Sequence, residues 1–301
     1  MRYKIQKINS MKKLVYVFIA VGFATCGLMA QDAASKNVRF GIFGRATPTW
    51  YSMPTNSNYA KGGAIFGAGF GLNLEFRITD VVSFQTGVGG DFDGGKIKYT
   101  YNIGTLNPAN DVYTGYLLDK TPALVEIKDH SPSDFNSGYT LGQYTAHYLT
   151  ARHIHTTYVT IPLILKMKTK EISGFKYFVD FGGHVGVLAS AKADDNTNDL
   201  NQVGSGLPSI TANTYKGVNI YKDCIPVRVG LNVGLGAEYR LAGTTSVFLS
   251  VNFVNSFIST VKSTSVYNST GTTVSNGYGA FVYAAQSLKT NGIQINAGFL
   301  F

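Results

Sequence analysis

Histidines are the first residues whose spacing could support chemistry. His153 and His155 stand two apart just before a predicted strand, and His147 and His130 lie upstream in the same long connection. Residues two apart share one face of an extended chain, so a zinc site at the surface is one interpretation. No Cys or acidic partner stands at a fixed spacing from them, and scattered exposed histidines are the better interpretation. We therefore predict no metal site.

Asp180 and His184 are the best candidates for general acid–base catalysis, because they lie four apart and share one face of a predicted strand. Four residues of strand separate them by about 13 Å, too far for a direct hydrogen bond. A serine and three acids near the outer end of that strand are also candidates for catalysis, but acidic residues are common in solvated turns at the base of a loop: Ser190, Asp194, Asp195 and Asp199. We predict no catalytic residue, and an enzyme is the least favoured class.

Two glycine-rich segments superficially resemble phosphate-binding loops, Gly182-Gly183-x-x-Gly186 and Gly230-x-x-x-Gly234-x-Gly236. A phosphate loop needs a helix after it, with Lys followed by Ser or Thr at its start, and both segments lie inside predicted strands. We predict no cofactor-binding residue and no cofactor.

The composition limits the class of protein. Of 301 residues only 14% are charged, while aromatic residues make up 13% and glycines number 34. Ordinary soluble domains are about 25% charged and about 7% Gly, and disordered chains have few aromatic residues. Beyond the N-terminus no apolar run approaches the roughly 20 residues of a membrane helix, which excludes a polytopic helical membrane protein. A Gly-rich β protein remains.

The N-terminal segment has the pattern of an export signal. A basic start at Met11-Lys12-Lys13, an apolar core and a small residue at Ala30 predict a signal peptide over residues 1–30, cleaved before Gln31. A lipoprotein signal at Cys26 is the less favoured alternative, and Met1 and Met11 are both candidate starts. Removing the five Lys or Arg of this segment lowers the net charge from +9 to +4, which disfavours a nucleic-acid partner.

The rest of the chain, residues 31–301, reads as one domain of eight strands with alternating faces. Between Ala64 and Arg77 the even positions are apolar and the odd positions are Gly, Asn, Glu, Arg or Ile, which is typical of a strand with one apolar and one small or polar face. The predicted strands are Val38–Tyr51, Ala64–Arg77, Val82–Asp91 with a continuation toward Tyr101, Tyr158–Lys168, Phe175–Ala189, Val227–Arg240, Ser246–Ser259 and Ile293–Phe301.

The connections alternate in length. Short turns follow the second, fourth and sixth strands, whereas the other joints are long and polar: residues 52–63, 102–157, 192–225 and 261–291. Long loops at one end and tight turns at the other are typical of an outer-membrane barrel, with the loops outside and the turns in the periplasm. We predict an all-β, eight-stranded antiparallel up-and-down transmembrane barrel in the bacterial outer membrane, with both termini periplasmic.

The chemistry of the two faces predicts which side meets lipid. Gly67, Gly71, Gly230 and Gly236 leave room inside a narrow barrel, and ionic groups in hydrocarbon would cost several kcal/mol each. We therefore predict a polar network in the lumen: Arg39, Arg45, Glu75, Arg77, Asp91, Lys166, Asp180, His184, Arg228 and Glu238.

One strand resembles a known family. Thr157-Tyr158-Val159-Thr160-Ile161-Pro162-Leu163-Ile164-Leu165-Lys166 is similar to the Tyr-x-x-Ile-Pro-Leu-Leu-Leu-Lys strand of PorT-like outer-membrane β-barrels. These occur in Gram-negative bacteria with a type IX secretion route. The Ala30-Gln31 junction and the final Phe301 extend the likeness, with Pro162 expected to face the lumen. The resemblance implies envelope assembly or secretion as the setting. Phe301 at the end of the last strand resembles the assembly signal that the barrel-insertion machinery reads on outer-membrane proteins, and a simple apolar strand end is the alternative.

These observations favour a non-enzymatic barrel with a structural or interaction role. The expected partners are outer-membrane lipid, the insertion machinery and an envelope or secretion protein that contacts the loops. Tyrosines in the long connections suit contacts with protein or glycan, or an outer aromatic girdle, and the two interpretations stand equal. The alternative function is a narrow channel or a barrel that binds a small ligand, with a continuous solvated track in place of paired Arg228, Glu238, Glu75 and Arg77.

Overall fold

The computed structural model describes residues 38–54, 59–99, 115–118, 124–125, 145–201, 209–275 and 278–301. The predicted signal peptide over residues 1–30 lies outside these ranges. All described residues except Val38 belong to one compact unit, Arg39–Phe301. Within the described ranges, no helix is both long and apolar enough to cross a membrane.

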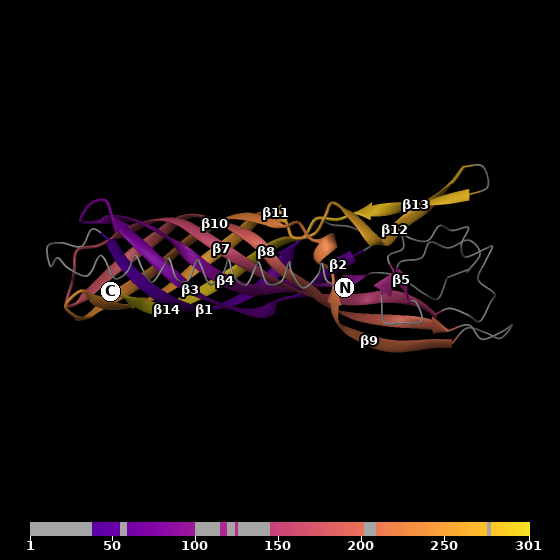
Figure 1. Ribbon diagram of the computed structural model, residues 1–301, viewed down its shortest axis with the longest axis horizontal. Helices are drawn as coiled ribbons and strands as arrows, with labels where there is room; N and C mark the ends of the chain where they lie inside the picture. Colours follow the sequence, from indigo (N-terminus) through magenta and orange to yellow (C-terminus); the bar gives the residue numbers. More distant parts are fainter. Residues whose placement is uncertain are drawn as a thin grey trace, which may run out of the picture. The chain divides into compact units, whose positions relative to one another are not determined.

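Eight long strands form a closed antiparallel barrel (Figure 1). In chain order they are β1 Val38–Ser52, β3 Ile65–Arg77, β4 Val82–Tyr99, β7 Thr145–Lys168, β8 Phe175–Asn201, β10 Val227–Ala242, β11 Thr245–Ser259 and β14 Lys289–Leu300. Each pairs with its neighbours in sequence, and β1 pairs with β14 to close the cylinder. The predicted fold class is confirmed.

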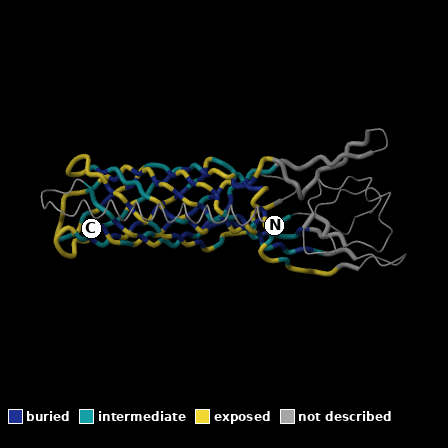
Figure 2. The backbone as a smooth tube through the Cα atoms, viewed as in Figure 1, coloured by how far each residue is buried: buried dark blue, intermediate teal, exposed yellow. Residues whose placement is uncertain are grey.

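The predicted alternation of the two faces runs along the barrel strands (Figure 2), with an interruption on β4, where Asp93, Gly94 and Gly95 are buried in succession. On β3, Asn73 and Glu75 are 4% and 3% exposed, whereas Leu74 and Phe76 are 38% and 39% exposed. The outward apolar run of β3 from Phe66 to Phe76 has a height of about 25 Å, given a rise of about 3.3 Å per residue and a tilt of about 40°. We call this outward apolar belt, repeated around the barrel, the lipid band; it matches the thickness of an outer membrane.

The three short connections lie at one end of the barrel together with the last residue of β14, and we call this the turn end. They span residues 78–81, 169–174 and 243–244. The opposite end, the loop end, carries the long connections. Phe301 exchanges backbone hydrogen bonds with Phe40 at the turn end, so the final residue still takes part in barrel closure.

The predicted long loops contain more strand than expected, which corrects the sequence analysis. β7 begins at Thr145, ahead of the predicted Tyr158, and β8 continues to Asn201, past the predicted Ala189. The two strands pair with each other beyond the lipid band, so their own hydrogen bonds sustain the sheet. Further strands follow in these connections: β2 Tyr59–Gly63, β5 Gly115–Leu118, β6 Leu124–Val125, β9 Ser209–Asn219, β12 Thr264–Ser275 and β13 Tyr278–Ala285, with a 3-10 turn η3 at Tyr221–Asp223.

β9 pairs with β8, and β5 pairs with β7, so a sheet continues from the barrel wall at the loop end (Figure 1). Of the tyrosines in the long connections, Tyr113, Tyr139 and Tyr144 lie outside the described residues, as does His130. His147 lies within β7.

Candidate functional site

The barrel interior is the candidate site, and it is arranged in layers along the strands. The inward residues of β1 show the order from the turn end: Arg39, then Phe43, Arg45, Thr47 and Thr49, and lastly Tyr51. Arg39, Phe43, Arg45 and Tyr51 each belong to a different layer. We call these layers the turn-end ion cluster, the aromatic layer, the central ion cluster and the outer plug.

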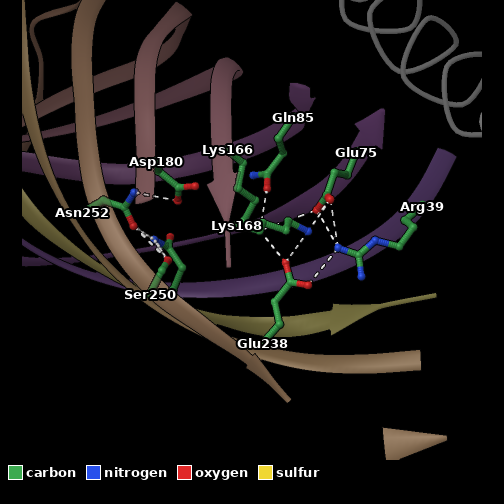
Figure 3. Close-up of polar contacts among 10 residues, drawn as sticks. Arg39, Glu75, Gln85, Lys166, Lys168, Asp180, Glu238, Ser250 and Asn252 are labelled. Atoms are coloured by element: carbon green, nitrogen blue, oxygen red, sulfur yellow. Dashed lines mark hydrogen bonds and ion pairs between the residues drawn. The ribbon is translucent and has the colours of Figure 1, made fainter. Parts of the chain in front are cut away.

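The turn-end ion cluster consists of Arg39, Glu75, Lys166, Lys168 and Glu238 (Figure 3). The Arg39 guanidinium lies 2.9 Å from both Glu75 and Glu238. Glu238 Oε1 also accepts from Lys166 Nζ at 3.0 Å and lies 2.8 Å from Lys168 Nζ, while Lys168 contacts Glu75 as well. Three cations from β1 and β7 thus share two carboxylates from β3 and β10, which ties four strands together across the lumen.

The aromatic layer rests directly on this cluster. Phe43, Phe178, Phe248 and Leu300 form a buried apolar group inside the barrel. Lys166 Nζ lies 3.9 Å from the centroid of the Phe178 ring, a distance at which a cation is attracted to the ring face. A Cβ on Gly236 would come within 2.4 Å of the same ring, so the small residue is needed for Phe178 to lie inside.

The amide side chain of Asn252 contacts Asp180 next to the aromatic layer (Figure 3). Asn252 Nδ2 donates to Asp180 Oδ2 at 3.2 Å and to Asn232 Oδ1 at 3.0 Å. Asn252 Oδ1 in turn accepts from Ser250 and from Asn296. Asp180 is therefore held by the amide of Asn252, and His184 packs over Gly230, where a Cβ would approach the imidazole to 2.6 Å. Asp180 and His184 line the same cavity, and no direct hydrogen bond joins them in the described part of the chain, as their spacing along β8 predicts.

The central ion cluster consists of Arg45, Asp91, Asp93 and Arg228. Asp91 lies 3.1 Å from Arg45 and 3.1 Å from Arg228, and Arg228 also contacts Asp93. The Arg228 guanidinium lies 4.1 Å from the centroid of the Tyr158 ring. Together with Asp180, the two ion clusters hold five cationic and five anionic side chains, so their formal charges cancel.

The outer plug closes the lumen at the loop end with apolar side chains. It comprises Tyr51, Ile97, Ile154, Tyr158, Leu188, Ala191, Ala193, Ile220, Cys224, Val261 and Leu288. Ile220 and Cys224 flank η3, so the connection from β9 to β10 folds over the mouth of the barrel. A cavity of about 60 Å³ lies between the aromatic layer and this plug, lined by polar residues that include Asp180 and His184.

Arg77 corrects the predicted lumen network. Its side chain is 48% exposed and pairs with Asp80 in the turn that follows. Arg77 is the last residue of β3, beyond the end of the barrel interior. Its side chain therefore lies in solvent, although its position in the alternation is an inward one. The four residues Arg228, Glu238, Glu75 and Arg77 were predicted to pair among themselves, but Arg228 pairs with Asp91 and Asp93, whereas Glu75 and Glu238 share Arg39.

The other predicted network residues lie inside the barrel, together with ionic and aromatic partners that the sequence pattern did not predict. Lys168 and Asp93 follow Lys166 and Asp91 by two residues, so the same alternation carried one step further identifies them. Phe43, Phe178 and Phe248 were missed because a large apolar side chain in a strand of this class is expected to face lipid. Pro162 is buried and lines the cavity, as expected.

Residues considered for chemistry at the loop end have structural partners. Asp195 forms a buried ion pair with Arg152, whose Nε lies 2.6 Å from Asp195 Oδ1. His155 Nε2 lies 3.4 Å from Asp194, which also accepts from the Gly217 backbone N–H at 2.9 Å. In the described part of the chain, no group of three or more His, Cys, Asp or Glu side chains is placed to hold a metal ion.

A closed eight-stranded barrel with an apolar outer wall, an ionic interior and tight turns at one end is an outer-membrane β-barrel. The chain belongs to the family described as "Outer membrane protein beta-barrel domain", whose family model matches residues 29–262. Comparison with curated proteins gave no match.

Among solved structures, the chain is similar to outer membrane protein OprG from Pseudomonas aeruginosa at 11% identity and a TM-score of 0.38, covering 89% of this chain and 98% of that one. It is also similar to Neisserial surface protein A, at 8% identity and a TM-score of 0.32, with 86% and 95% covered. The attachment invasion locus protein Ail of Yersinia pestis matches at 9% identity and a TM-score of 0.27, with 87% and 98% covered. At these identities the function has to be argued from this chain's own residues.

Proposed function

We propose that this protein is a non-conducting, non-enzymatic outer-membrane barrel that anchors a surface-exposed extension for contact with another envelope protein. The observation that carries the proposal is the filled lumen. Charged groups are neutralised in two clusters, and apolar side chains close the loop end. An eight-stranded barrel is just wide enough for its own side chains to fill, so the wall and the extension are left to carry function.

The proposed orientation places the loop end outside the cell and both termini in the periplasm. This follows the usual arrangement of outer-membrane barrels, whose short turns are periplasmic. In that orientation the extension formed by β7, β8 and β9 stands above the outer leaflet. From Val187 to Asn201, β8 continues for roughly 46 Å along the strand. A PorT-like affiliation and a link to envelope assembly or secretion remain part of the proposal, supported by the strand Thr157–Lys166.

A narrow channel or a ligand-binding barrel is the alternative. Against it, a cavity of about 60 Å³ has room for only a few water molecules. The ions of the two clusters each have a partner of opposite charge, and Asp180 accepts from Asn252, so a permeating ion would have to displace these contacts. An enzyme is disfavoured because Asp180 is engaged by Asn252 and lies apart from His184.

Conductance in planar bilayers tests the closed lumen. The wild-type barrel should show no stepwise conductance, and Arg228→Ala should remain closed because the outer plug and the turn-end ion cluster are untouched. Discrete channel openings in the wild type that change with Arg228→Ala would contradict the proposal and favour the channel.

Site-specific photocrosslinking in intact cells tests the interaction role. A crosslinking residue at Thr211 on β9, which is exposed, should give a discrete protein adduct, whereas one at Lys176 near the turn end serves as the matched control. Absence of any adduct at Thr211 and at other exposed positions of β9 would contradict a role for the extension. Surface accessibility of a tag at Thr211 in unbroken cells tests the orientation separately.

A further inference from the structure

A basic patch lies on the outer wall of the barrel at the loop end, and we call it the rim patch. It consists of Lys96 and Lys98 on β4, His153 and His155 on β7, and Lys192 on β8. Lys96 pairs across the ladder with His153, and His155 pairs with Lys192, so these side chains are neighbours on one face. The adjacent residues Ile97, Ile154 and Ala193 are buried, which fixes the rim patch on the outward face.

The rim patch lies directly beyond the lipid band on all three strands. Moving toward the turn end, the first large outward side chains are Phe92 on β4, Val159 on β7 and Val187 on β8, which are 44%, 48% and 57% exposed. Four or five residues separate each from the patch. The patch is therefore at the depth of the head groups that cover the lipid band.

The charge of the rim patch is strongly one-sided. Asp194 is the acid within it, and this residue already contacts His155 and the Gly217 backbone. Three lysines and two histidines thus face one carboxylate that is committed to other partners. His153 lies outside the membrane-spanning part of β7, and its pKa is lowered by burial and then by the positive charges of Lys96 and His155, against weaker opposite effects of Asp194 and Asp195.

We propose that the rim patch binds the phosphate groups of a phosphorylated glycolipid in the outer leaflet. Strands lie about 4.8 Å apart and residues rise about 3.3 Å each, so the five residues span roughly 10 Å across the strands and roughly 13 Å along them, with Lys96, His153, His155 and Lys192 closest together. Two or three cationic groups can therefore reach one phosphate, and charge-assisted bonds to phosphate are strong. Lysine stems extend along the apolar surface with their ammonium groups at the interface, which suits a ligand anchored in the adjacent lipid.

This inference rests on the proposed orientation, since the phosphorylated glycolipid has to be on the side of the loop end. A soluble polyanion could bind a basic patch at any position on the extension, so a soluble ligand would not require the patch to border the lipid band. A position bordering the lipid band favours a ligand whose acyl chains pack on Phe92, Val159 and Val187 while its phosphate meets the lysines.

Lipid retention tests the rim patch. The full barrel is reconstituted in phosphatidylcholine nanodiscs with a small fraction of bisphosphorylated lipid A, purified in detergent, and the bound lipid A is quantified by mass spectrometry. The Lys96→Gln/Lys98→Gln/Lys192→Gln variant should retain at least about fivefold less lipid A than the wild type. A matched variant with the same change in charge elsewhere, Lys170→Gln/Lys176→Gln/Lys262→Gln, should retain as much as the wild type.

Two further arms identify the chemistry. In the first arm, the wild type is loaded with dephosphorylated lipid A. It should retain as little of this lipid as the lysine variant retains of bisphosphorylated lipid A. In the second arm, at the same pH, the His153→Ala/His155→Ala variant should retain an amount of bisphosphorylated lipid A between those of the wild type and the lysine variant, because it removes two of the five side chains that can donate to phosphate. Gel mobility of unboiled samples serves as the folding control, because a variant that has failed to fold migrates at the same position with and without boiling.

Equal retention by the wild type and the patch variant, or equal retention of phosphorylated and dephosphorylated lipid, would overturn the inference. Orientation in the cell does not enter this measurement. A negative result therefore concerns the rim patch alone, whereas a closed lumen and a surface-exposed Thr211 are tested by conductance and by accessibility in intact cells.

Discussion

The lumen is closed by polar chemistry at one end and by apolar packing at the other. The turn-end ion cluster holds Glu238 between Arg39, Lys166 and Lys168, whereas the outer plug packs Leu288 and its neighbours without an ion pair between its members. Ionic contacts tie specified strands together with defined geometry, and apolar packing excludes water without regard to direction. The difference suggests that the ion cluster sets the barrel's shape and the plug keeps its mouth dry.

The reactivity of Cys224 offers the largest expected effect. This thiol lies in the outer plug beside η3, outside the membrane-spanning strands, and burial, with Asp223 adding to it, raises its pKa from the ordinary 9.0 to about 12. Only the thiolate reacts, so three pKa units lower the reactive fraction at pH 8 about a thousandfold. Maleimide labelling followed by mass spectrometry should be about a thousandfold slower in the folded barrel than in urea. Rates within tenfold of each other would show that the plug is open.

Glu238→Ala should weaken the ion cluster most. The substitution leaves Arg39, Lys166 and Lys168 facing the single carboxylate of Glu75, and breaking a buried ion pair costs about 3–5 kcal/mol. We expect the free energy of unfolding to fall by about 4 kcal/mol, measured by urea titration in phospholipid vesicles. Glu171→Ala is the control, because that carboxylate lies in an exposed turn. Equal losses for the two variants would remove the special role of the cluster.

Leu288→Ala should loosen the plug by a somewhat smaller amount. Leu288 is 1% exposed, and deleting a buried leucine side chain costs about 3 kcal/mol when the cavity does not collapse. The same titration measures the loss. Labelling of Cys224 should also become at least about tenfold faster in this variant and stay slow in Glu238→Ala. Unchanged labelling in Leu288→Ala would mean that the plug does not act as a unit.

Arg77→Ala should have the smallest effect. Arg77 and Asp80 form an exposed pair within one turn, and such surface pairs contribute at most about 0.5 kcal/mol. Urea titration should give a free energy of unfolding within that margin of the wild type. A loss approaching that of Glu238→Ala would place Arg77 within the ion cluster after all.

The eight strands and the direction of their faces could be predicted because period-two alternation is a local property of the sequence. Glu75 and Leu74 differ in exposure as their positions in the pattern require. The extent of β7 and β8 could not be predicted in the same way. Beyond the lipid band both faces of a strand are free to be polar, so His153 and Asp194 show no alternation of polarity that marks them as strand residues.

The pairing inside the lumen was the least predictable part. Whether a side chain faces the interior depends on its position along its own strand. The partner of Arg228, in contrast, depends on how far β4 and β10 are shifted along the barrel axis relative to each other, and these strands are not neighbours in the barrel wall. The aromatic layer is hidden for another reason. Phe178 follows the inward phase of β8, yet it is as apolar as the lipid-facing residues beside it, and Gly236 opposite it is the one local sign of the space it needs.

The pairing of β1 with β14 also constrains biogenesis. β1 is the first barrel strand to be synthesised and its partner is the last, separated by nearly the whole described sequence. Until the twelve residues of β14 arrive, β1 carries an unpaired hydrogen-bonding edge that invites aggregation. The closed cylinder therefore cannot form until β14 has been synthesised.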